Sequence, residues 1–209
     1  MAVSMLESAV AALWELDTAA SLRVRQSDDH VDEEEVAIEG RTHELLALHH
    51  PFGRSFRALV FILKVNAELE RVADHAASIA KQTPKIAAAV PPGVTIRWPT
   101  ALRELGQRVP AMCHQLMRAV LDEDVEAARL LVRSDEVIDE LERRLFEETQ
   151  DLVRQLHRTD AALTIGILVY RIGRELERVG DLMASVAEDV VYVATGEIIR
   201  HEKRRRPKT

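Results

Sequence analysis

Apolar residues recur every three or four positions along most of the chain, which is the spacing of one face of an α-helix. One such stripe runs from Leu59 to Ile79, and a second runs from Ile167 to Val186. Strict alternation of apolar and polar residues, the pattern of a half-buried strand, is hard to find anywhere. The pattern therefore predicts an all-α protein.

We expect six helices in two sets of three, at about residues 4–16, 18–49, 54–81, 99–121, 125–157 and 159–194. Asp17 and Asp124 each precede the second helix of a set, where a short carboxylate can accept from the first free amides as an N-cap. Pro84 is expected to stop the third helix, because proline lacks the donor that a helix interior needs. The pair Thr195-Gly196 is expected to end the last helix.

The chain also repeats itself. Residues 68–74 read ELERVAD and residues 175–181 read ELERVGD, so that Glu70 and Glu177 are related by a shift of 177 − 70 = 107 positions. The same shift applies without interruption from residue 17 to about residue 81. One unbroken shift means two copies of one structural unit. The expected fold is two tandem three-helix bundles related by an internal repeat.

Prolines cluster between the two copies, which marks a connection there. We divide the chain into a first bundle at residues 1–83, a proline-rich linker at 84–98, a second bundle at 99–198 and a basic tail at 199–209. Residue 1 corresponds to residue 108 of the second copy. The first helix is therefore expected to lack the opening turns of the fourth, either because translation starts upstream or because this bundle is short.

Acidic residues are expected to meet at one level of each helix hairpin, since residues equidistant from the turn lie level. Asp28 and Asp74 each lie 23 residues from Pro51, in the first turn. Asp32 and Glu70 each lie 19 residues from the same proline. The same spacing about residue 158 relates the acidic residues of the second copy, which are Asp135, Asp139, Glu177 and Asp181.

Four carboxylates held together favour a bound cation, because two of them about 6 Å apart repel by roughly 3 kcal/mol at an effective dielectric of about 20. Oxygen ligands suit Mg²⁺, Mn²⁺, Ca²⁺ or iron, whereas zinc usually requires histidine or cysteine. The eight acidic residues are therefore our candidate ligands for divalent or trivalent metal ions. Two alternatives stay open: acidic faces that are merely solvated, and ion pairs with Arg71 or Arg178 that spread the carboxylates apart.

Composition narrows the classes of function. The net charge of −7 and the pI near 5.7 argue against nucleic acid as a partner. Cys113 is the single cysteine, so no internal disulfide can form. No run approaches the roughly 18 apolar residues of a membrane span, and we expect a cytoplasmic protein whose basic tail makes at most peripheral membrane contact. The absence of Glu-x-x-His from the sequence counts against ferritin-like metalloenzymes.

The segments at 70–76, 177–181 and 187–197 resemble the paired acidic signatures and the closing segment of the PhoU family, the regulators of phosphate uptake. The resemblance extends over about residues 10–200. It implies a pair of three-helix bundles, commonly a homodimer, with acidic motifs that bind metal ions, sometimes as clusters. The ions expected are Mg²⁺, Mn²⁺ or iron.

The same resemblance implies a cytoplasmic adaptor between the phosphate ABC transporter and a sensor histidine kinase. Such proteins hold the phosphate-starvation response off when phosphate is plentiful, and no catalytic activity is established for them, so we expect no enzyme. Gly173 stands where the first copy has Asn66, so the two metal sites need not be equivalent. The alternatives are a carboxylate-bridged metalloenzyme and a helical scaffold that binds no metal.

Overall fold

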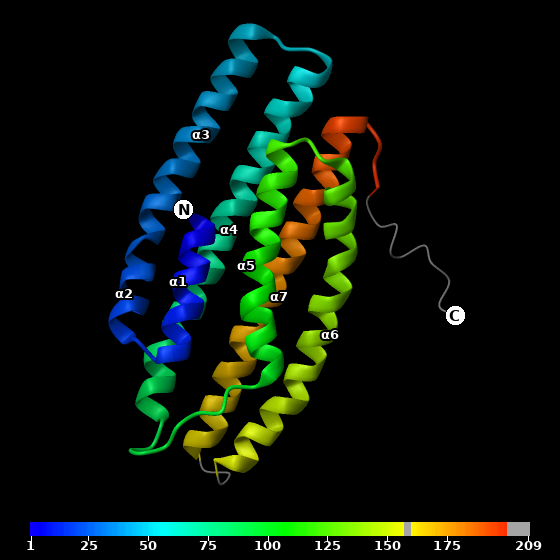
Figure 1. Cartoon of the computed structure of the whole chain (residues 1–209). Helices are drawn as coiled ribbons and strands as arrows, with labels where there is room; N and C mark the ends of the chain where they lie inside the picture. Colours follow the sequence, from blue (N-terminus) through cyan, green and yellow to red (C-terminus); the bar gives the residue numbers. More distant parts are fainter. Residues whose placement is uncertain (157–159, 200–209) are drawn as a thin grey trace, which may run out of the picture.

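A computed structural model of the chain describes residues 1–156 and 160–199, and within these ranges it contains helices and no strand (Figure 1). The helices are, in chain order, α1 (Ala2–Glu15), α2 (Thr18–Gln26), α3 (Asp28–His49), α4 (Gly53–Ala89), α5 (Thr100–Leu121), α6 (Val125–Gln155) and α7 (Asp160–Thr195). The expected turn at Arg158, the helix limits placed at 157 and 159, and residues 200–209 of the expected tail lie outside the described residues.

The architecture is the predicted pair of helical bundles. The α3–α4 hairpin projects at one end of the molecule and the α6–α7 hairpin projects at the other (Figure 1). Helices α4 and α7 pack against each other and join the two bundles. None of the helices in the described part is both long and apolar enough to cross a lipid bilayer.

The expected helix at 18–49 is divided at Ser27 into α2 and α3. The hydroxyl of Ser27 donates to the carbonyl oxygen of Arg23 at 3.1 Å, and the backbone N–H of Ser27 is shared between the carbonyls of Arg23 and Val24, each at 3.1 Å. A serine hydroxyl that bonds to the preceding turn competes with the regular helical ladder. The interruption is therefore local, and α3 begins at the next residue, Asp28.

The expected stop at Pro84 is wrong, because α4 passes through this proline and ends at Ala89. Proline in a helix interior costs about 3 kcal/mol through the lost hydrogen bond and the ring clash. The neighbouring side chains of Gln82, Thr83 and Ile86 are fully buried, and their packing offsets that cost. The connection between the bundles accordingly begins after Ala89. Pro110 likewise lies inside α5 without ending it.

The capping predictions are confirmed in both copies. A carboxylate oxygen of Asp17 accepts from the backbone N–H of Ala20 at 2.9 Å, and Asp124 accepts from Ala127 at the same distance. The last helix ends at Thr195 as predicted, and Gly196 follows with a left-handed φ of 79°. The two copies of the repeat therefore share the same N-cap contact at the start of their second helix.

A polar contact lies inside the joint between the bundles. The carboxylate of Glu175 on α7 is buried and accepts from the hydroxyl of Ser78 on α4 at 2.9 Å. Its other oxygen lies 2.7 Å from Nδ1 of His75, also on α4. A buried carboxylate needs such partners, so this contact helps to fix α4 against α7 and, with them, the positions of the two bundles.

Gly173 lies where α7 passes very close to α6. A methyl group at this position would lie 1.9 Å from Cδ2 of Leu145, a fully buried side chain that would have to shift. We expect Gly173→Ala to lower the free energy of unfolding by about 1–3 kcal/mol through overpacking. Urea unfolding measures the effect.

The matched control is Gly40→Ala on α3, because a methyl group there would meet nothing within 4 Å. This substitution is expected to leave stability unchanged or to raise it by up to about 1 kcal/mol, since alanine favours helix. Equal destabilisation by both substitutions would contradict the close approach at Gly173.

Candidate metal centres

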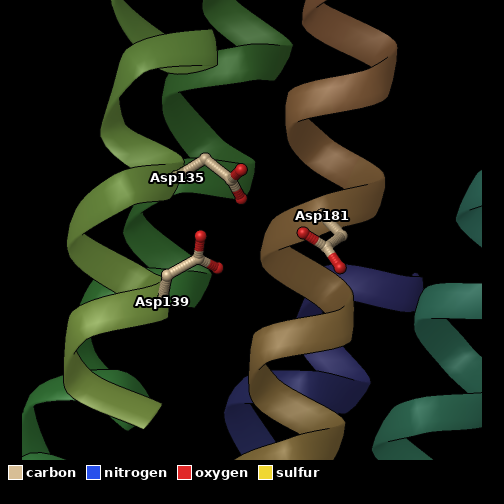
Figure 2. A group of neighbouring side chains, drawn as sticks. All are labelled: Asp135, Asp139 and Asp181. Carbon is tan, nitrogen blue, oxygen red and sulfur yellow. The ribbon is translucent and has the colours of Figure 1, made fainter. Parts of the chain in front are cut away.

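Three of the candidate ligands of the second bundle converge between α6 and α7. Asp135 and Asp139 lie one turn apart on α6 and point toward Asp181 on α7 (Figure 2). One carboxylate oxygen from each lies within 4.8 Å of the others. The two residues on α6 are half-buried and Asp181 is exposed. Three oxygens at this separation can surround one cation, with an open side toward solvent.

Glu177, the fourth candidate of this bundle, is not part of that compact triad. Its Oε1 lies 3.3 Å from Nη1 of Arg174, one turn earlier on α7. Burial raises the pKa of Glu177 and the neighbouring Asp181 adds to the rise, whereas Arg174 lowers it. Electrostatically, Glu177 therefore belongs to the cluster, although an arginine holds one of its oxygens.

In the first bundle, α3 supplies Asp28 and Asp32, and α4 supplies Glu70 and Asp74. Burial raises the pKa of Asp28, and the charges of Asp74 and Asp32 raise it further. Burial likewise raises the pKa of Glu70 to about 7, with further increases from Asp74, Glu35 and Asp32. The charges of these positions therefore influence one another across the α3–α4 hairpin. Among the described residues, however, only Asp135, Asp139 and Asp181 form a group of three whose ligand atoms lie within 4.8 Å of one another.

The arginines expected to compete for these carboxylates face other residues. Nη1 of Arg71 bonds to Glu68 at 2.9 Å, and Nη1 of Arg178 lies 3.9 Å from Glu175. Within residues 1–156 and 160–199, no basic side chain forms an ion pair with the four acidic positions of the first bundle. The ion pair suggested for Arg71 is therefore contradicted, and Arg178 faces Glu175.

The donor set fits a hard cation. Among the described residues, Oδ1 of Asp28 and Oε2 of Glu177 are buried without a hydrogen-bond partner. A buried carboxylate oxygen with no partner is costly, and either a proton or a cation can satisfy it. Because the converging groups are oxygens alone, Mg²⁺, Mn²⁺, Ca²⁺ and iron suit them better than zinc.

Sequence reasoning missed a fifth carboxylate in each bundle. Glu35 adds to the raised pKa of Glu70, and Glu142 adds to that of Glu177. The repeat shift relates this pair as well, since 142 − 35 = 107. The signal was thus present in the sequence. No sequence pattern indicated Arg174, which contacts Glu142 at 3.6 Å as well as Glu177.

The difference between Asn66 and Gly173 has a structural reason in each copy. The side-chain amide of Asn66 donates to the backbone carbonyl of Glu35 at 2.8 Å and ties α4 to α3. Gly173 instead permits the close packing of Leu145.

Cys113 is buried, as expected of a structural thiol, and burial raises its pKa to about 12.

Comparison with known proteins identifies relatives over most of the chain. The PhoU domain matches residues 1–83 and 102–190. The phosphate-specific transport system accessory protein PhoU homolog of Deinococcus radiodurans is 32% identical over 174 residues, which cover 83% of this chain and 78% of the relative. The phosphate-specific transport system accessory protein PhoU of Escherichia coli is 27% identical over 206 residues, which cover 96% and 80%.

Solved structures show the same fold. The crystal structure of PhoU from Pseudomonas aeruginosa superimposes with a TM-score of 0.83 at 25% identity, covering 94% of this chain and 91% of that one. The phosphate transport system regulatory protein PhoU from Streptococcus pneumoniae gives a TM-score of 0.82 at 25% identity, covering 95% and 90%. The family match spans both bundles and both acidic clusters, and the chain belongs to the PhoU domain family.

Proposed function

We propose that this protein is a non-catalytic accessory protein that regulates a phosphate-specific transport system. The observation that carries the proposal is the family match, which extends over residues 1–83 and 102–190 and therefore takes in both bundles. Its relatives in Deinococcus radiodurans and Escherichia coli are named as accessory proteins of phosphate-specific transport. The relative in Streptococcus pneumoniae is named as a regulatory protein of phosphate transport.

In this role the protein acts in the cytoplasm as an adaptor between a phosphate ABC transporter and a sensor histidine kinase. When phosphate is plentiful, it holds phosphate uptake and the phosphate-starvation response down. Long helical faces suit such a role, because they can pack against the helices of a partner protein. The α3–α4 hairpin is one such face, since it projects beyond the body of the first bundle (Figure 1).

A second copy of the chain is the partner that we propose for part of this hairpin. Phe52 is 86% exposed and Leu48 is 66% exposed at its tip. Leu45 is 43% exposed, whereas its counterpart in the second copy, Leu152, is 2% exposed. Exposed apolar side chains that lie close together commonly mark protein contacts, which supports a homodimer.

Each bundle binds a hard cation in this proposal. Asp28, Asp32, Glu70 and Asp74 hold it in the first bundle, and Asp135, Asp139, Glu177 and Asp181 hold it in the second. A bound Mg²⁺, Mn²⁺ or iron ion supplies the positive charge that the carboxylates need. In each bundle the ligands come from two helices. When they hold an ion, they fix α3 relative to α4 and α6 relative to α7, and so shape the surface offered to partners.

The regulatory role predicts a phenotype. A strain that lacks the protein is expected to express a phosphate-starvation reporter although phosphate is ample, and the wild-type chain is expected to silence it. The double variant Asp32→Asn, Asp139→Asn is expected to silence it less well, because each metal centre loses a ligand. Glu33→Gln is the control, since this neighbouring carboxylate is 79% exposed and lies outside the cluster. A reporter that stays silent without the protein would contradict the role.

The raised pKa of Glu70 predicts how the metal-free protein responds to pH. In the folded protein the pKa rises from 4.5 to about 7, so the folded state binds more protons than the unfolded state between these values. The contribution of Glu70 to the free energy of unfolding is therefore fully present below pH 4.5 and is lost as the pH rises through about 7. Glu70→Gln is expected to raise the urea midpoint of the metal-free protein at pH 8, with little change at pH 4.

The control for this measurement is Glu68→Gln, whose carboxylate is already paired with Arg71. This variant is expected to gain no stability at pH 8. Adding Mn²⁺ at pH 8 is expected to stabilise the wild type and to have less effect on Glu70→Gln, because binding to the folded state alone stabilises it. A midpoint for Glu70→Gln that matches the wild type at pH 8 would show that Glu70 is not under electrostatic strain.

A further inference from the structure

The two acidic centres differ by one built-in positive charge. Nη1 of Arg174 lies 3.3 Å from Oε1 of Glu177 and 3.6 Å from Oε1 of Glu142. The residue equivalent to Arg174 in the first copy is Ala67, since 174 − 67 = 107, and it is exposed. The same acidic framework is thus present twice, once with a resident arginine and once without.

We propose that Arg174 is a tethered cation that competes with metal for Glu177, so that the two bundles bind a hard divalent cation with unequal affinity. The first bundle binds tightly, and the second binds fully only after Arg174 has released Glu177. This inference rests on the metal centres of the proposed function. It names Arg174 as the residue that sets the affinity of the second centre.

The geometry of the second centre supports the competition. Asp135, Asp139 and Asp181 bring their oxygens within 4.8 Å of one another, but Glu177 does not join them. Glu177 keeps Oε1 beside Arg174, while its buried Oε2 has no hydrogen-bond partner among the described residues. A metal that is to gain Glu177 as a ligand must therefore draw this side chain away from the arginine.

The chemistry of arginine makes it an effective competitor. A guanidinium group stays protonated at any physiological pH, so Arg174 can leave only by moving. Its side chain is 40% exposed, which leaves a path toward solvent. A fixed positive charge close to a divalent ion also repels it, and the half-buried surroundings weaken screening by water.

Tyr170 reinforces the difference between the centres. Its hydroxyl donates to Oε1 of Glu142 at 2.5 Å, so that the fifth carboxylate of the second centre is held by both a phenol and an arginine. The equivalent residue in the first copy is Leu63, which has no hydroxyl to donate. Glu142 and Glu177 of the second centre are therefore held by Arg174, whereas the five carboxylates of the first centre form no ion pairs with basic side chains within the described ranges.

The test measures Mn²⁺ affinity by titration calorimetry in full-length protein with one centre disabled at a time. Asp32→Asn with Asp74→Asn leaves the second centre, and Asp139→Asn with Asp181→Asn leaves the first. We expect the first centre to bind Mn²⁺ at least about tenfold more tightly than the second. Arg174→Ala, which installs the residue of the first copy, is expected to lower the dissociation constant of the second centre at least about tenfold.

Two further variants complete the design. Ala67→Arg introduces the competing charge into the first centre and is expected to weaken Mn²⁺ binding there at least about tenfold. Arg178→Ala is the matched control, because it removes one positive charge one turn further along α7, where the arginine faces Glu175. This control is expected to change the affinity of the second centre less than about threefold, since its guanidinium faces Glu175 rather than Glu177.

The outcomes separate this inference from the proposed function. If both centres bind Mn²⁺ but Arg174→Ala leaves the second centre unchanged, Arg174 is only a structural ion pair and the inference is overturned, while the metal centres stand. If neither centre binds Mn²⁺, the metal part of the proposed function falls together with the inference. Should Arg174→Ala lose helical structure by circular dichroism, Ala67→Arg decides, and unchanged affinity in that variant overturns the inference.

Discussion

The mutual repulsion of carboxylates held between paired helices is the constraint on which this account depends. The α3–α4 hairpin carries four acidic side chains whose charges influence one another, and burial raises the pKa values of Asp28 and Glu70 there. Packing of this kind would be stable without any acidic residue, so the cluster adds cost rather than stability to the empty fold. Bound cations would offset the repulsion among the carboxylates. The rigidity of each hairpin would then depend on metal.

Because the fold is an internal repeat, it contains two such acidic centres, but the packing around them differs. Gly173 lets α7 approach Leu145, whereas Asn66 uses its side chain to tie α4 to Glu35. Arg174 has no counterpart in the first copy. The polar contact among His75, Ser78 and Glu175 joins the two bundles through α4 and α7. A change in one hairpin therefore has a direct structural route to the other.

Most of the fold could be predicted from the sequence, because a constant shift of 107 positions fixes which helices correspond and which acidic residues lie level. The caps at Asp17 and Asp124 followed from local chemistry alone. Pro84 was misjudged, since its local penalty is offset by burial that only the tertiary structure reveals. Arg174 was missed for a related reason: a single arginine on a helix indicates nothing until the rotamer and the opposing carboxylates are known.

The most direct measurement of the central claim is the anomalous scattering of crystals of the wild-type protein grown with Mn²⁺, recorded on both sides of the manganese absorption edge. The account predicts an anomalous peak among Asp28, Asp32, Glu70 and Asp74, and a second, less occupied peak at low Mn²⁺ concentration among Asp135, Asp139 and Asp181. Absence of a peak at both positions when Mn²⁺ is saturating would contradict the account, because the acidic clusters would then be solvated surfaces and not metal centres.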